Sequence, residues 1–324
     1  MTRVRRPFVQ TVIVCMATLV MVLFCEAQQS PMPAKTATQE LYRQLRTVPL
    51  DPTLIFKIRE ATIDREDLHL YLTDGVICFT RTVDGRVTGA FFEGQGEVLV
   101  RPPDNSERAS LGLFAGQGVL DEHFETAYIR FNDTTATDLQ SSLRQIDDTG
   151  QEFLSKYSDT AQNLALMDAL RLLSSCTSHY PQDRFFHARL GGTRLGVFDV
   201  SYDSMAEEQI SIGKFQTNAL GTFYDIWMSF AARSARNLTN PESRIVDPWR
   251  SSAAVKVTKF DISATLIPPQ TIHAKADLTL TVPHGGQRLL FFELSRYLKV
   301  EKVTSGAQTL EFLQNESVDG TQLA

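Results

Sequence analysis

The sequence has few cysteines, no excess of basic residues and no two histidines four residues apart. Four of its 324 residues are cysteine, and none shows the Cys-x-x-Cys or Cys/His spacing of a zinc site. Lys and Arg number 32 against 38 Asp and Glu, so the net charge of −6 gives no electrostatic footprint for nucleic acid. The rest of the composition, with 43% apolar and 22% charged residues, is typical of a globular protein with room for two domains.

A long apolar run, residues 12–24, lies near the N-terminus and follows three arginines. A basic start and an apolar run too short to span a bilayer comfortably are typical of a secretory signal peptide. The small residues Cys25 and Ala27 predict cleavage after Ala27. Acylation of Cys25 and an uncleaved signal are the alternatives, and the second would leave the chain membrane-anchored. All three predict export to the periplasm or the cell exterior, with no membrane contact beyond the signal sequence.

The cysteines that remain after such cleavage are Cys78 and Cys176. Both lie among apolar neighbours, so buried free thiols are favoured over a disulfide between them. The mature chain is also more acidic than the whole, because residues 1–27 hold three arginines and one glutamate.

The first half of the mature chain predicts an antiparallel β meander with two central helices. Asp74-Gly75 and Asp84-Gly85 separate alternating apolar runs, and Asp-Gly is a strong hairpin signal because both central turn residues need positive φ. Residues 134–146 and 151–174 contain no Pro or Gly, and apolar residues recur at helical spacing in the second segment. Strand patterns return between 185 and 228.

The clearest period of two residues follows an aperiodic stretch. Apolar and polar residues alternate strictly over 274–282, and Pro283-His284-Gly285-Gly286 then turns the chain. Further strands are expected at 288–294, 297–303 and 309–313, the last two joined by a turn at Ser305-Gly306. Alternation of this kind is typical of an antiparallel sheet with one face in water.

The predicted fold class is therefore α+β, a β meander with two central helices followed by an antiparallel sandwich or saddle-like β domain. The expected segments are a signal peptide (1–27), a linker with a short helix (28–52), an N-terminal α+β domain (53–235), a linker (236–252) and a β domain (253–324). A turn followed by only four residues at the C-terminus predicts that the last sheet is incomplete.

The order of the C-terminal segments is a strand at 255–266, a hairpin at 275–294, a Leu-x-Val-x-x-Val strand from Leu298, a Gly turn and an apolar-polar-apolar strand. This order resembles the opening of the N-terminal β domain in the M1 family of zinc aminopeptidases. The region before it, including residues 99–103 and 123–131, is similar to the extension that precedes this domain in some secreted bacterial M1-like proteins.

The resemblance implies a zinc domain that lies outside this sequence. In the family a His-Glu-x-x-His helix and a downstream Glu hold the zinc, and a Gly-x-Met-Glu-Asn strand binds the substrate amine. Neither motif occurs here, so no catalytic, cofactor-binding or metal-ligating residue is carried over. Zinc is expected only in a downstream catalytic domain of the same polypeptide, which would be the partner of this chain.

Asp121, His123 and Glu125 form the densest group of titratable residues. On a strand they would share a face, which makes an acid/base or metal role conceivable. A solvated, charged start of a strand is the commoner arrangement, because no second pair of ligands stands at a recognisable spacing.

The sequence favours a non-catalytic N-terminal portion of an exported M1-like metallopeptidase. The alternative is an exported binding or scaffold module without peptidase activity. A self-sufficient hydrolase that uses Asp121, His123 and Glu125 is the least favoured of the three.

Overall fold

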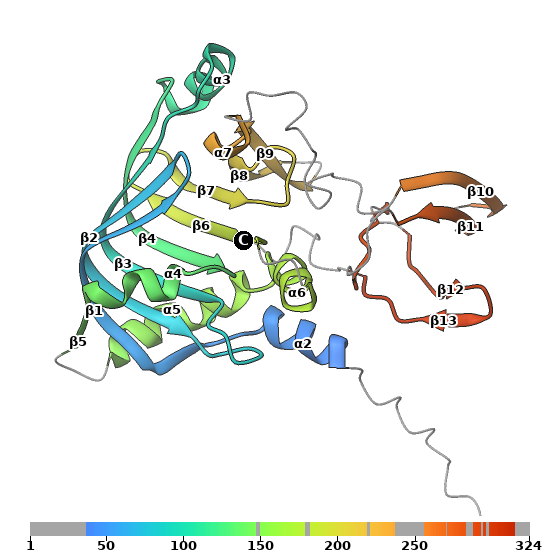
Figure 1. Ribbon diagram of the computed structural model, residues 1–324, viewed down its shortest axis with the longest axis horizontal. Coiled ribbons are helices and arrows are strands. Elements are labelled where there is room, and N and C mark those ends of the chain that lie inside the picture. The colour runs from blue at the N-terminus through green and yellow to red at the C-terminus, as the bar shows by residue number, and fades with distance from the viewer. Residues whose placement is uncertain are drawn as a thin grey trace, which may run out of the picture. The chain divides into compact units, whose positions relative to one another are not determined.

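Antiparallel strands dominate the computed structural model (Figure 1). The structure describes residues 37–146, 150–178, 182–218, 221–236, 256–269, 271–282, 288–292, 294–295 and 298–314. A long meander with helices beside it confirms the predicted α+β class. The expected signal peptide and the cleavage point after Ala27 lie outside the described residues.

A nine-stranded sheet forms the first part of the chain, in the order β5-β1-β2-β3-β4-β6-β7-β8-β9, with every neighbouring pair antiparallel. Its strands are β1 (Leu50–Arg65), β2 (Leu68–Thr80), β3 (Gly89–Val100), β4 (Leu120–Phe131), β5 (Leu143–Gln145), β6 (Phe185–Gly192), β7 (Gly196–Asp203), β8 (Ile210–Asn218) and β9 (Gly221–Phe230).

Short helices precede, separate and follow these strands. They are α2 (Ala37–Arg46), α3 (Asn105–Ala115), α4 (Thr135–Leu139) with the 3₁₀ turn η1 (Gln140–Ser142), α5 (Gln151–Leu164), α6 (Ala169–Thr177) and α7 (Arg233–Arg236). The helix predicted over 134–146 ends early, because residues 143–145 pair with β1 as β5. The helix predicted over 151–174 is two helices, and Asp168 stands at the N-cap of the second.

The two Asp-Gly signals have different outcomes. Asp84 and Gly85 have φ angles of 51° and 74°, so the predicted turn joins β2 to β3. The turn predicted at Asp74-Gly75 is wrong, because β2 runs straight through it. Gly75 lies opposite Gly94 of β3 at a register shift, so close that a Cβ on Gly75 would be 2.3 Å from the carbonyl oxygen of Glu93. The glycine permits close strand contact there instead of reversal.

The sheet curls so that one of its faces packs on itself, and Figure 1 shows the curvature. We call this the inner face. Apolar side chains from β1–β4 and from β6–β9 meet on it, including Leu70, Phe92, Phe124, Phe198 and Trp227. Contact between β2 and β7, which are not neighbours in the sheet, shows that the curled halves touch. This closure buries the main hydrophobic core.

Helices cover the opposite, outer face of the sheet. Helix α5 places Phe153, Tyr157 and Ala161 against Phe91 and Tyr128 of β3 and β4. The rings of Phe91 and Tyr157 stack with centroids 4.3 Å apart. Helices α2 and α6 form a second apolar cluster beside it. Both sides of the central strands are therefore buried.

The C-terminal part contains two β-hairpins among its described residues. The first pairs β10 (Lys256–Ile267) with β11 (Thr271–Thr281), and the second pairs β12 (Val303–Ser305) with β13 (Gln308–Leu310) around Gly306, whose φ is 57°. The turn expected at Ser305-Gly306 is therefore present. The described residues of 288–294 form no strand, and the strand expected over 297–303 is reduced to its last residue. The turn expected at 283–286 lies outside the described residues.

Candidate functional site

The predicted trio Asp121, His123 and Glu125 lies on the solvent-facing side of β4. The burial pattern of the strand alternates, so all three side chains are exposed and share a face, as the sequence predicts. Glu97 of β3 pairs with His123 across the sheet. Such an arrangement of hydrated side chains on a flat surface offers no enclosed site for chemistry.

The buried residue in the same segment is Glu122, which sequence reasoning missed. Its Oε1 accepts hydrogen bonds from the backbone N–H groups of Arg194 and Leu195 at 2.6 and 2.9 Å. Its Oε2 lies 3.1 Å from the Arg194 guanidinium. Glu122 therefore fixes the β6–β7 turn, and its role is structural.

Among the described residues, no group of three or more His, Cys, Asp or Glu side chains is placed to hold a metal ion. Cys78 is buried and Cys176 is partly buried, and both thiols are free.

No helix within the described ranges has both the length and the apolar composition needed to cross a bilayer.

A buried charge network lies on the outer face, centred on His187 of β6. Its Nδ1 is 2.7 Å from Asp168 Oδ2, and its Nε2 is 3.2 Å from Asp199 Oδ1. Arg189 lies 3.7 Å from the same Asp199 oxygen. Burial lowers the pKa of His187, but the two carboxylates outweigh that cost and raise it to about 10.

The network stabilises buried charges, and its geometry does not match that of an acid/base catalytic site. Both ring nitrogens of His187 are bonded to carboxylates, so neither is free to accept a proton from a substrate. Burial raises the pKa of Asp168, but the charge and hydrogen bond of His187 together with the charges of Arg130 and Arg171 outweigh it, and the net shift is downward. The protonated imidazole thus ties the start of α6 to β6 and β7.

Two buried or partly buried arginines, Arg171 and Arg130, hold neighbouring parts of the outer face together. Arg171 of α6 donates to Asp203 at 2.7 and 2.8 Å and to Asp183. Arg130 is fully buried and donates to the carbonyl oxygens of Thr88 and Ala165 at 3.1 and 2.8 Å. These bonds join helices to strands, which is a structural role.

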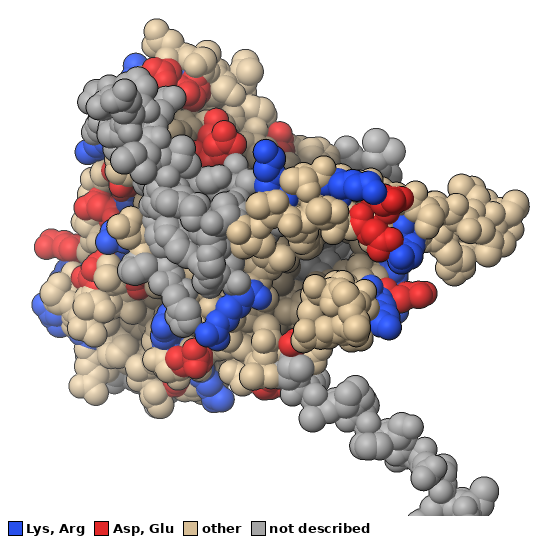
Figure 2. All heavy atoms as spheres, turned by 45° about the vertical axis from the view of Figure 1, so that its right-hand side comes forward, with Lys and Arg blue, Asp and Glu red and all other residues tan. Residues whose placement is uncertain are grey.

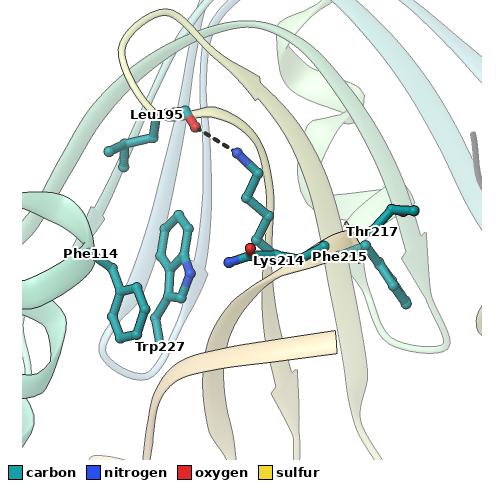
Figure 3. Close-up of a pocket in the computed structure, with 7 residues that line it drawn as sticks. Phe114, Leu195, Lys214, Phe215, Thr217 and Trp227 are labelled. Atoms are coloured by element: carbon teal, nitrogen blue, oxygen red, sulfur yellow. Dashed lines mark hydrogen bonds between the residues drawn. The ribbon is translucent and has the colours of Figure 1, made fainter. Parts of the chain in front are cut away.

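A pocket of about 390 Å³ opens on the inner face, where α3 approaches β8 and β9 (Figure 3). Residues from four separate segments line it: Phe114, Leu195, Lys214, Gln216, Thr217 and Trp227. Described residues that line it include one cation and no carboxylate. Lys214 reaches towards the carbonyl oxygen of Leu195 at 3.4 Å, which is long for a hydrogen bond.

Aromatic rings and an unsatisfied donor mark the wall of this pocket. The Trp227 ring stacks between Phe114 and Phe198, with both centroid distances 5.8 Å and interplanar angles of 8° and 19°. Trp227 is 4% exposed, and within the described part of the chain its Nε1–H has no hydrogen-bond acceptor. Figure 3 shows this nitrogen on the side of the ring that faces Lys214.

Sequence reasoning did not find this pocket, because its residues are spread over more than one hundred positions, from Phe114 to Trp227. Helix α3, which carries Phe114, was also missed. Its signals were present: Pro102-Pro103 before the helix, a capping interaction from Glu107 to the backbone N–H of Asp104, and Gly116 in the left-handed conformation at its end. Only the curl of the sheet brings α3 to β9.

On the face that Figure 2 shows, acidic and basic side chains lie interspersed among neutral ones. The pocket brings together a lysine, an indole N–H and aromatic rings, which makes it a candidate binding site. Comparison of the chain with known protein families, curated proteins and solved structures finds no match in any of the three.

Proposed function

We propose that this chain is the non-catalytic N-terminal portion of an exported M1-like zinc metallopeptidase of the aminopeptidase type. Its C-terminal part would pack against a catalytic domain of the same polypeptide, and its large sheet would shape access to that domain. The observation that carries the proposal is the surface of the β10–β11 ribbon, which is apolar on one whole face.

The apolar face follows from the register of the ribbon. Residues directly opposite each other in an antiparallel pair lie on the same face, and side chains alternate along each strand. Five cross-strand pairs of one face are entirely apolar: Val257–Leu280, Phe260–Leu278, Ile262–Ala276, Ala264–Ala274 and Leu266–Ile272. The opposite face carries Lys, Asp, Ser, Thr and His, with Ile267 as its one apolar member among the paired residues.

The apolar face is in large part exposed. Phe260, Ile262 and Leu266 are 61%, 63% and 75% exposed. A two-stranded ribbon is marginally stable by itself, and contiguous exposed apolar surface marks a place where another surface binds. Further strands or a domain laid on this face would complete a layered β structure.

The test is the gene beyond the codon for Ala324, together with the intact mass of the native protein. We expect an open frame that encodes a His-Glu-x-x-His helix, and a native polypeptide well above the 36.3 kDa of this chain. A stop codon at that point, with a native mass equal to that of the chain with or without residues 1–27, would contradict the proposal.

The second candidate is an exported binding module without peptidase activity. The specific observation in its favour is the lysine- and aromatic-lined pocket on the inner face. The gene test distinguishes the two candidates, because a binding module needs no downstream zinc motif.

A further inference from the structure

We propose that the pocket beside Trp227 binds a small carboxylate that bears an aromatic or flat apolar group. The pocket is formed by residues of the nine-stranded sheet and α3. The peptidase assignment depends on the β10–β11 ribbon and the downstream gene, so this proposal can be tested independently of it.

The polar groups of the pocket select an acceptor with negative charge. The ammonium of Lys214 has three N–H donors, and the structure shows one long contact for it, to the Leu195 carbonyl at 3.4 Å. The indole N–H of Trp227 is a donor only, and it is unsatisfied in the described structure. Two converging donors beside a formal positive charge match a carboxylate, whose oxygens only accept.

No competing carboxylate among the described residues lines the pocket. The nearest in register is Asp225, directly opposite Lys214 on β9. One of its oxygens accepts a hydrogen bond of 2.6 Å from the Gln216 amide. Gln216 thus holds Asp225, and the structure gives Asp225 no ion pair with Lys214.

The apolar part of the pocket selects a flat group. Phe114, Trp227 and Phe198 form a continuous stack, and Phe114 at its outer end is 39% exposed. Stacking on such a platform favours aromatic rings over branched aliphatic groups. Leu195 lies beside the stack, whereas the ring of Phe215 lies on the other face of β8, against Tyr224 and the Arg189 guanidinium. Phe114 and Phe198 cover both faces of the Trp227 ring, so its N–H edge is the part of the indole that faces Lys214 (Figure 3).

The orphaned indole N–H argues against a purely structural pocket. Most buried donors in proteins have an acceptor, and an unsatisfied one needs an explanation. The carbonyl oxygen of Trp227 is satisfied by the Ser110 hydroxyl at 2.8 Å, so the backbone of the residue is held in place while its ring nitrogen is left open. A ligand oxygen at that nitrogen would complete the set of bonds.

Phenylacetate is a suitable probe, and the indole N–H resonances of the whole chain are a specific readout. The sequence contains only two tryptophans, Trp227 and Trp249, so a ¹H–¹⁵N spectrum has two indole signals. We expect phenylacetate to shift the Trp227 signal saturably and to leave the Trp249 signal in place. A Trp249→Phe variant assigns the two signals.

Matched ligands and variants then test each part of the inference. Phenylacetamide, which is neutral, and Lys214→Met, which keeps the apolar stem, should each weaken binding about ten- to a hundredfold. Lys256→Met removes an exposed lysine of β10 and should leave the affinity unchanged. A spectrum with wild-type dispersion confirms that Lys214→Met is folded.

Three results would overturn the proposal. They are a Trp227 signal that does not move with phenylacetate, equal affinity for phenylacetate in Lys214→Met and wild type, and equal affinity for phenylacetamide. Tighter binding of benzylamine than of phenylacetate would also contradict it, because the sign of the charge would then be wrong.

Discussion

At the scale of single residues, the protonation state of His187 affects the stability of the fold. It is buried between Asp168 and Asp199, and its imidazole is charged in the folded state. Removing one partner of a buried, hydrogen-bonded charge set leaves the others uncompensated, which costs about 3–5 kcal/mol. The same residue is a good probe of the pH dependence of folding.

We expect His187→Gln to lower the free energy of unfolding and to flatten its dependence on pH. The pKa of His187 is raised from an ordinary 6.5 to about 10 in the folded protein, so its stabilising effect is complete below pH 6.5. That effect is lost as the pH rises from 6.5 through about 10. Urea unfolding of wild type and variant between pH 6 and 10 measures the difference.

His123→Gln is the matched control, because His123 is exposed on β4. It should change stability by less than about 0.5 kcal/mol at every pH. If the difference in the free energy of unfolding between wild type and His187→Gln is constant across this pH range, His187 is neutral in the folded protein, contrary to our assignment.

At the scale of elements, the periodicity of the sequence locates strands well and their ends poorly. Alternation placed β6, β7 and β10 within a few residues, since one buried face dictates a period of two. It failed at Asp74-Gly75, where the same dipeptide that makes a turn at Asp84-Gly85 makes a close glycine contact between β2 and β3. Local sequence does not distinguish these uses, because the difference lies in the neighbouring strand.

The candidate sites show the same limit. The alternation of β4 predicted correctly that Asp121, His123 and Glu125 share a face, but it gave no sign that Glu122 would be the buried residue bonded to a distant turn. The pocket beside Trp227 was beyond local patterns altogether, because it depends on the curl of the whole sheet.

The β10–β11 ribbon carries a prediction of its own. In the chain as it stands, its apolar face should bind the dye 1-anilinonaphthalene-8-sulfonate and promote self-association. Leu266→Lys places a charge on that face at the turn end of the ribbon, where the side chain is 75% exposed, and should reduce both effects. Dye fluorescence and light scattering at several concentrations measure them.

The control for this variant is Thr265→Lys, one residue away on the polar face of the ribbon. It adds the same charge without touching the apolar face, so dye binding and association should match wild type. Equal behaviour of the two variants would show that the apolar face is not an accessible surface.

At the scale of the whole molecule, the nine-stranded sheet should be more stable than the β10–β11 ribbon. The curl of the nine-stranded sheet buries its inner face, and α2, α5 and α6 cover part of its outer face. The ribbon consists of two strands, and most of its side chains are exposed. Local opening costs little free energy where few apolar contacts are lost. The two parts should therefore exchange their amide hydrogens at different rates.

We expect hydrogen exchange on the intact chain to protect β2, β3 and β4 strongly and β10 and β11 weakly, because the ribbon gains little stability from two strands. Mass spectrometry of peptides from each strand gives the comparison, with the short edge strand β5 as an internal example of a weakly held element. If a downstream domain covers the apolar face, the amide hydrogens of the ribbon should be better protected in the longer native polypeptide than in this chain. The protection of β2 and β3 should be the same in both. Equal protection of the ribbon and the large sheet in the isolated chain would show that the ribbon needs no partner, and would remove the main structural support for the proposed packing role.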